Sequence, residues 1–397
     1  MDTKKNDLKQ NIVLLGIVSF LNDLSSEMIS PILPRFITFL GGGSLAVGLI
    51  GGLMESISSI LKVFCGYLSD RTGKRKVFVF SGYFTSSIFK LMLAFSKTWQ
   101  HVLVFVSLER VGKGLRTAPR DAIIADSVKD ERERGKGFGI HRSLDTLGAI
   151  FGSFFAAILL WHNLTFKTII LIAAIASFLS LIPLTRVKET EKERQDVSLR
   201  IGLKNLPKRL KLFILVSATF AFANFSYMFF LLKAQETFPD GMLKNVIPVF
   251  LYVLFNVFYA AFAIPFGMLS DKIGREKVIV FGYLLFSLTT LGFAFFNSMF
   301  AFIFLFALYG VVFAIIDGNQ RAFISDLSTK DLRATALGTY HTTVGLIALP
   351  SSIIAGTLWK ISPATTFIFG SVVSFVSVLL FLYWLEEFKK QSKTLSS

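Results

Sequence analysis

The sequence predicts an all-α membrane protein whose twelve transmembrane helices form two six-helix halves. Three observations predict this class: the number of long apolar segments, the distribution of Lys and Arg among the loops, and a repeat that relates the two halves of the chain. The 397 residues are 53% hydrophobic and include 44 Phe. A soluble domain of this length is less apolar.

Each apolar segment is long enough for a helix that crosses the hydrocarbon core of a membrane, which takes about 20 residues. The segments lie at residues 11–36, 45–68, 77–96, 99–127, 135–160, 164–185, 211–234, 245–269, 277–296, 299–326, 334–358 and 364–385. One long polar segment separates the sixth from the seventh. It divides the chain into an N-terminal half (1–185), a linker (186–210) and a C-terminal half (211–397).

The basic residues predict the orientation. With the N-terminus in the cytoplasm, the cytoplasmic segments contain 28 Lys and Arg, whereas the opposite loops contain 4. Because basic loops stay in the cytoplasm, we expect both termini there, in a multi-pass protein of the inner membrane. The bias also explains the net charge of +16 through topology and contact with lipid headgroups, so nucleic acid is not an expected partner.

An internal repeat predicts the two-half architecture. Residues 66–83 (GYLSDRTGKRKVFVFSGY) match residues 267–283 (GMLSDKIGREKVIVFGY) at an offset of 201. A weaker repeat pairs PRDAIIADS at 119–127 with NQRAFISDL at 319–327. Two copies of a six-helix unit joined by a basic linker are typical of transporters whose binding site lies between the halves.

The segment G-x-L-S-D-R-x-G-[KR]-[KR] at 66–75 resembles the signature loop of the major facilitator superfamily (MFS). The resemblance covers the whole chain and implies the MFS fold around a central cavity, with a charge latch that holds one transport conformation. The latch residues it implies are Gly66, Asp70, Arg71, Gly73, Lys74, Arg75, Arg110, Asp271, Gly274 and Arg275. Asp70 could also cap the third helix. The alternative is a topology signal with a tight turn at Gly73.

Two further motifs are similar to those of proton-coupled exporters. Arg110-Val-Gly112-Lys-Gly114 is similar to their fourth-helix motif, and Gly148-Ala-Ile-Phe-Gly152 to their fifth-helix motif. The fifth-helix match is incomplete, because Ser153 stands where the motif has proline. The strings FLNDLSSEM and RVGKGLRTAPRDAIIADS also resemble a large bacterial branch of the superfamily, in which some members are linked to siderophore or iron handling.

The fourth span carries the densest charge. Glu109, Lys113, Arg116 and Arg120 recur at steps of four, three and four, so they form one stripe on a helix. Each charge in mid-membrane costs about 2.5–3.5 kcal/mol, so the stripe faces either a watery cavity or paired carboxylates. Cavity lining and a structural ion-pair network are both open. The candidates for the substrate cavity are Lys113, Arg116, Arg120, Asp121, Arg142, Asp145, Gln320 and Arg321.

The first span carries Asp23 and Glu27 one turn apart. Burial of a carboxyl group raises its affinity for a proton, which a proton carrier needs. Alternatively, the two acids neutralise arginines of the fourth span. The seventh span has Phe225 where the first has Asp23, which favours a coupling site in the N-terminal half. The full set of proton-coupling candidates is Asp23, Glu27, Glu55 and Asp317.

These observations predict a monomeric secondary active transporter that moves a small organic solute by alternating access, with proton-coupled efflux favoured. One alternative is an uptake permease for an anionic solute such as a ferric siderophore. An alternative from another class is a membrane sensor that does not transport. We expect no enzyme activity, no cofactor and no metal, because the sequence has no Walker loop, no nucleophile elbow and a single cysteine, Cys65.

Overall fold

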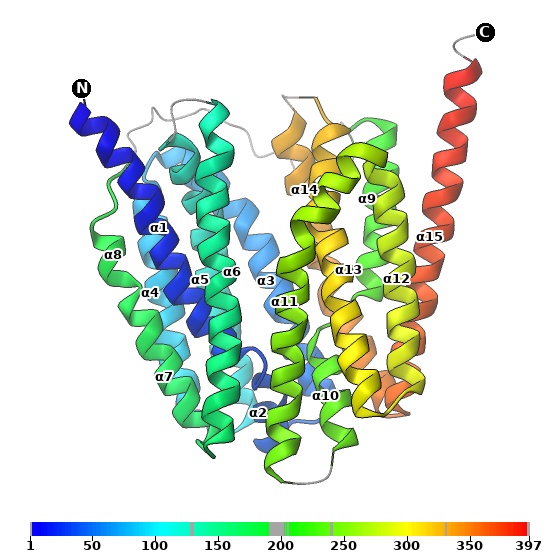
Figure 1. Ribbon diagram of the computed structural model, residues 1–397. Helices are drawn as coiled ribbons and strands as arrows, with labels where there is room; N and C mark the ends of the chain where they lie inside the picture. Colours follow the sequence, from blue (N-terminus) through cyan, green and yellow to red (C-terminus); the bar gives the residue numbers. More distant parts are fainter. Residues whose placement is uncertain are drawn as a thin grey trace.

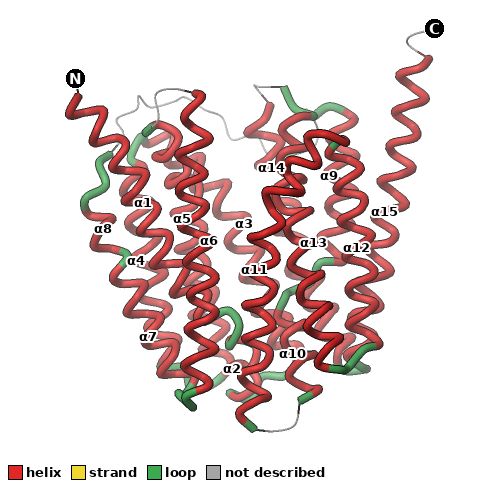
Figure 2. The backbone as a smooth tube through the Cα atoms, in the orientation of Figure 1, coloured by secondary structure: helices red, strands yellow, loops and turns green. Residues whose placement is uncertain are grey.

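The computed structural model describes residues 2–127, 131–189, 202, 204, 206–238, 241–329 and 332–394, and within them it contains helices and no strands (Figure 2). The N-terminal helices are α1 (Asp2–Ile29), α2 (Leu33–Phe39), α3 (Ser44–Thr72), α4 (Arg75–Ala94), α5 (Trp99–Asp126), α6 (Glu131–Trp161), α7 (Phe166–Leu179) and α8 (Leu181–Thr185). The C-terminal helices are α9 (Lys208–Ala223), α10 (Met228–Thr237), α11 (Met242–Ile273), α12 (Arg275–Phe295), α13 (Met299–Asp326), α14 (Arg333–Trp359) and α15 (Pro363–Thr394).

Within the described residues, eleven helical segments are long and apolar enough to cross a membrane. The predicted fourth span is the exception. It corresponds to α5, which runs through the bundle beside α4 and α6 but contains seven charged residues (Figure 1). With α5, the structure contains the twelve spans that the sequence predicts, and the charge of α5 has to be accommodated inside the protein.

The first and seventh spans are both interrupted at similar positions. The first leaves the helix after Ile29 and resumes at Leu33, with Pro34 in the first turn of α2, where proline is tolerated. The seventh is broken at residues 224–227, between α9 and α10. The two interruptions lie in corresponding places of the two halves, as expected for discontinuous helices beside a central site.

The helices form two bundles, α1–α8 and α9–α15, which diverge toward the end that carries the start of α1 and the end of α15 (Figure 1). They meet where α3 packs against α14 and α6 against α11. Small residues allow the close approach of α3 and α14, since Ser44 Oγ donates to Gly356 O at 2.8 Å and Ser56 Oγ to Gly345 O at 2.5 Å. At the opposite end of the bundle, α2 packs against α10.

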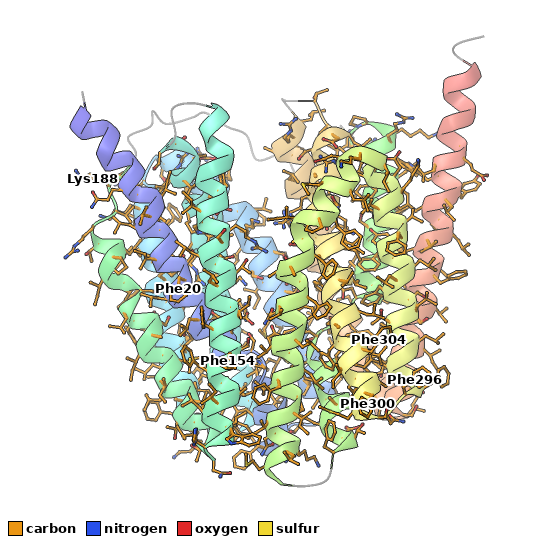
Figure 3. The ribbon with its side chains drawn as sticks, viewed as in Figure 1. Phe20, Phe154, Lys188, Phe296, Phe300 and Phe304 are labelled. Carbon is orange, nitrogen blue, oxygen red and sulfur yellow. The ribbon has the colours of Figure 1, made fainter. Side chains whose placement is uncertain are left out.

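The outer surface carries many of the phenylalanines. Figure 3 shows Phe296, Phe300 and Phe304 on the outside of the C-terminal bundle, and Phe300 is 86% exposed. A contiguous apolar surface of this kind is expected where helices face lipid. Other phenylalanines fill the C-terminal bundle, in which Phe230, Phe293 and Phe306 are buried.

Candidate functional site

A cavity of about 530 Å³ lies between the two bundles. Its volume is in the range of small-molecule binding sites. The N-terminal wall comes from α1, α3, α5 and α6, and the C-terminal wall from α9, α11, α13, α14 and the break between α9 and α10. The position therefore agrees with a binding site at the interface of two repeats.

Charged residues dominate the N-terminal wall. Its charged members are Asp23, Glu27, Glu55, Arg110, Lys113, Arg142 and Asp145. The C-terminal wall contributes Asp317, Arg321 and Gln320. The structure thus brings together all four residues expected to take part in proton coupling and five of the eight expected to line a substrate cavity. Their roles remain hypotheses.

Three of the cavity carboxylates, Asp23, Glu27 and Glu55, have no salt bridge to any residue of the described ranges. Neutral groups bind them instead. Asn22 Nδ2 donates to Asp23 at 3.3 Å, Tyr252 OH donates to Glu27 at 2.9 Å, and Ser59 Oγ donates to Glu55 at 2.7 Å. The contact from Tyr252 crosses between the halves, because Glu27 lies on α1 and Tyr252 on α11.

The remaining cavity carboxylates are paired with arginines. Arg142 Nη1 binds Asp145 at 3.0 Å, and Arg321 Nη2 binds Asp317 at 2.6 Å. Tyr259 joins the two pairs, since its hydroxyl donates to Asp317 at 2.8 Å and accepts from Arg142 Nη2 at 2.8 Å. These residues form a polar bridge between α6 and α13 that includes both halves.

The predicted stripe on α5 is divided by helix packing. Lys113 lines the cavity, whereas Arg116, Arg120 and Asp121 lie outside its lining, which corrects the expectation for these three residues. Arg116 is 3% exposed and lies over the Tyr83 ring at 4.5 Å, with its guanidinium bound to Ser86.

The close approach of α4 and α5 explains this burial. A side chain at Gly112 would collide with the α4 backbone at Gly82, so the two helices lie too close together for Arg116 to turn toward the cavity. Arg120 Nη2 instead binds Asp121 at 2.9 Å. Asp23 and Glu27 form no salt bridge with Arg116 or Arg120, whereas neutralisation of these arginines was the alternative interpretation.

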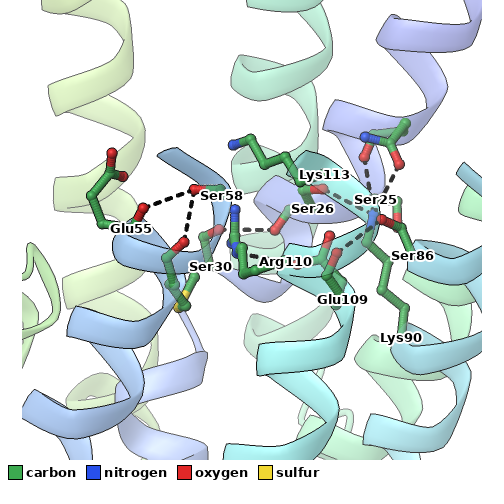
Figure 4. Close-up of polar contacts among 12 residues, drawn as sticks. Ser25, Ser26, Ser30, Glu55, Ser58, Ser86, Lys90, Glu109, Arg110 and Lys113 are labelled. Carbon is green, nitrogen blue, oxygen red and sulfur yellow. Dashed lines mark hydrogen bonds and ion pairs between the residues drawn. The ribbon is translucent and has the colours of Figure 1, made fainter. Parts of the chain in front are cut away.

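Lys90 is a buried charge that the sequence analysis did not identify. It lies on α4, is 2% exposed, and donates to Ser26 Oγ at 2.9 Å, Ser25 Oγ at 3.1 Å and Asn22 at 3.3 Å (Figure 4). These partners lie beside the cavity acids along α1, so Lys90 contacts a neighbouring face of the same helix. The sequence feature that could have identified it is a single lysine in a third span without any other charged residue.

A second feature that the sequence analysis missed is an aromatic wall on the C-terminal half. Its members are Phe220, Phe225, Tyr227, Tyr252, Phe255, Tyr259, Tyr309, Phe313 and Tyr340. The spacing of Tyr252, Phe255 and Tyr259 by three and four residues places these rings on one face of α11 and was visible in the sequence. The N-terminal wall contributes no aromatic residue to the lining of the cavity.

The two signature loops have the same arrangement in both halves. Arg75 binds Asp70 at 2.8 Å and also contacts Asp126. In the C-terminal half, Arg275 binds Asp271 at 2.9 Å and Asp326 at 2.5 Å. Each arginine therefore ties together three helices of its own half. The second acid comes from the weaker repeat, at positions offset by 200.

Several expectations for the loops need correction. Asp70 does not cap α4, because it lies in the last turns of α3, and Lys74, the residue before α4, makes no capping side-chain bond. Arg110 is remote from the loop, since it lines the cavity and pairs with Glu109 at 3.1 Å (Figure 4). Gly73 makes the expected tight turn, with φ of 70°.

The other expected loop residues lie around these turns. A side chain at Gly66 would contact Ala118 of α5 at 3.0 Å, and Gly274 ends α11 with φ of 99°. Arg71 is exposed, and its guanidinium donates to Tyr67 OH at 3.3 Å. The loop glycines thus permit the positive φ angles of the turns and the close packing between helices.

Two pseudo-repeated six-helix halves around a polar cavity define the class of polytopic membrane transporters that work by alternating access. The particular family follows from comparison with known sequences. The family model described as the Major Facilitator Superfamily matches residues 15–249 and 249–396, so the chain belongs to this superfamily. Its members are transporters, not enzymes.

Individual proteins of similar sequence or structure agree with this assignment to the superfamily. An uncharacterised MFS-type transporter of Methanocaldococcus jannaschii is 56% identical over 381 residues, which cover 95% of each chain. The branch expected to be bacterial therefore includes an archaeal relative. Multidrug resistance protein MdtH of Cronobacter sakazakii is 30% identical over 129 residues, 32% of each chain. The crystal structure of the POT family transporter PepTSo superposes with a TM-score of 0.81 at 12% identity, covering 96% of this chain and 98% of that one, which shows a common fold.

Proposed function

We propose that the protein is a proton-coupled secondary active transporter that moves a small organic solute through the central cavity by alternating access. The observation that carries this proposal is the presence of Asp23, Glu27 and Glu55 in the cavity without a salt bridge in the described structure. An ionised carboxylate inside the membrane is costly unless it is paired or faces water, so acids retained there without a salt bridge indicate a function. Reversible protonation gives these groups such a function.

Glu27 is the first candidate for the coupling residue. It accepts a hydrogen bond from Tyr252, which belongs to the opposite half. When the halves rock, this bond has to break, so the movement changes the surroundings of the Glu27 carboxyl group and with them its affinity for a proton. Asp23 is the second candidate. Its carboxyl group interacts with that of Asp145, and two interacting carboxyl groups can share a proton.

The coupling experiment compares two kinds of flux in proteoliposomes that contain Asp23→Asn or Glu27→Gln. One is solute accumulation driven by an imposed pH gradient, and the other is counterflow without a gradient. The coupling residue should lose gradient-driven accumulation and keep counterflow, because a neutral side chain can no longer carry the proton. If both variants accumulate solute as the wild type does, these acids do not couple transport to protons.

We propose efflux as the direction, with both termini in the cytoplasm. The basic bias of the loops supports the orientation, and the similarity of one third of the chain to MdtH supports efflux. In this orientation the diverging end of the bundle in Figure 1 faces the cytoplasm. The direction of the imposed pH gradient distinguishes antiport from symport. An acidic lumen should drive solute into the vesicles for an antiporter, whereas acid outside would do so for a symporter and would contradict efflux.

A further inference from the structure

We infer that the substrate is an aromatic carboxylic acid, whose carboxylate binds Lys113 on the N-terminal wall of the cavity and whose ring packs against the aromatic C-terminal wall. This inference rests on the proposed transport function and names its substrate class. It follows from the unequal chemistry of the two walls. Of the lining residues, seven on the N-terminal wall are charged and none is aromatic, whereas the C-terminal wall supplies nine aromatic rings.

Lys113 is the cation that remains available to a ligand. The arginines of the cavity are all paired: Arg110 with Glu109 at 3.1 Å, Arg142 with Asp145 at 3.0 Å and Arg321 with Asp317 at 2.6 Å. The Lys113 ammonium, in contrast, makes no hydrogen bond or salt bridge with the described part of the chain, and Figure 4 draws its nitrogen without a contact.

A carboxylate substrate suits the cation that remains available. The acids of the same wall, Asp23, Glu27 and Glu55, each accept a hydrogen bond from a protein donor. Lys113 has no such partner, and a carboxylate provides the charge-assisted hydrogen bond that an ammonium group prefers.

The opposite wall is suited to a flat ring. Its rings form a continuous series, with centroid distances of 5.6 Å from Tyr227 to Tyr252, 5.5 Å from Tyr252 to Phe255, 5.0 Å from Phe255 to Tyr309 and 5.0 Å from Tyr309 to Phe313. Aromatic pairs at such distances gain energy beyond area burial. A substrate ring would extend the series into the cavity.

Two donors in this wall select for an oxygen on the substrate ring. Tyr309 and Asn256 line the cavity, and the Tyr309 hydroxyl and the Asn256 amide nitrogen are buried without a hydrogen-bond partner among the described residues. A buried donor without a partner is costly, so a site built in this way favours a ligand that supplies an acceptor. A hydroxyl or oxo group on the ring would accept from Asn256.

The test measures equilibrium binding of radiolabelled 4-hydroxybenzoate to the purified full-length protein without a pH gradient. Unlabelled 4-methylphenol, which lacks the carboxylate, should compete at least about tenfold more weakly, because it cannot bind Lys113. Cyclohexanecarboxylate, which lacks the ring, should compete about threefold to tenfold more weakly. The inference is overturned if either compound competes as well as 4-hydroxybenzoate, or if 4-hydroxybenzoate does not bind at up to about 1 mM.

Variants locate the site. Lys113→Met should weaken binding about tenfold to a hundredfold, and Lys113→Arg should restore most of it. Lys233→Met is the matched control, since Lys233 is buried in α10 but does not line the cavity. Asn256→Leu should abolish the preference for 4-hydroxybenzoate over benzoate. Unchanged affinity in Lys113→Met would overturn the proposal, and the competitor series on the wild type tests it even if a variant does not fold.

The same compounds separate this inference from the proposed function. If 4-hydroxybenzoate binds but no pH gradient drives its accumulation, proton coupling is wrong and the substrate class stands. If a pH gradient drives accumulation of other solutes while aromatic acids neither bind nor compete, the substrate class is wrong and proton-coupled transport stands.

Discussion

At the scale of residues, the two signature arginines differ in burial although their partners correspond. The Arg75 side chain is 5% exposed, and its partners Asp70 and Asp126 are 38% and 26% exposed. The Arg275 side chain is 24% exposed, and its partners Asp271 and Asp326 are 61% and 55% exposed. Since solvent screens exposed ion pairs, the N-terminal cluster is the stronger of the two.

This difference predicts unequal effects of two matched substitutions. Asp70→Asn should cost about 1–3 kcal/mol of stability, as expected for loss of a charge-assisted bond to a buried arginine. Asp271→Asn should cost less than about 1 kcal/mol. We also expect Asp70→Asn to impair transport more, with membrane insertion intact in both. Thermal unfolding and transport at matched expression provide the measurement. Equal transport by the wild type and Asp70→Asn would contradict the proposed latch.

At the scale of elements, the α3–α14 contact holds the halves together over much of the length of α3. It runs from Ser44 against Gly356 to Gly345 against Ser59. Gly48 lies within it, and a side chain there would collide with the carbonyl group of Ser352. Because the collision involves backbone, side-chain movement cannot relieve it. The contact therefore depends on small residues, which allow α3 and α14 to pack closely in this conformation.

Gly48→Ala should consequently shift the protein away from this conformation. As α3 and α14 separate, rocking should bring the halves together at the end where they now diverge. Spin labels at Thr72 and Lys272, introduced in a Cys65→Ser background, should show a larger population of short distances. Gly267→Ala is the control, because an added side chain there meets no atom within 4 Å. An unchanged distance distribution in Gly48→Ala would show that the contact does not set the conformational equilibrium.

At the scale of the whole molecule, orientation in the membrane decides which side the cavity opens to. The prediction is that both termini and the linker are cytoplasmic, because 28 of the Lys and Arg outside the spans or at their ends lie on that side and 4 on the other. Reporter fusions at residue 198 and at the C-terminus should both give cytoplasmic signals. A periplasmic signal from either would exclude this topology and reverse the proposed direction of access.

The spans and their repeat could be predicted from the sequence, because a lipid environment demands about 20 apolar residues for each crossing and the two halves repeat their loops. Eight of the twelve predicted segments begin and end within about four residues of a single helix, and the last one continues in α15 to Thr394. The first, sixth and seventh were predicted as single segments, although the structure divides each into two helices: α1 and α2, α7 and α8, and α9 and α10. The acids of the first span, which the sequence offered as proton-coupling candidates, line the cavity, since charges in apolar helices face the interior.

Periodicity alone could not divide the charges of α5 between cavity and core. Lys113 and Arg116 lie on one stripe of the helix, yet only Lys113 reaches the cavity, because the crossing of α4 and α5 at Gly82 and Gly112 encloses Arg116. The pairing of Arg75 with Asp126, across 51 positions, and the contact of Lys90 with α1 likewise depend on helices that are distant in sequence. The sequence by itself determined the number of spans, the repeat and the interior location of the charges. Only the tertiary structure decided which charges neutralise one another and which remain available to a solute, because both depend on distances between helices that no local pattern encodes.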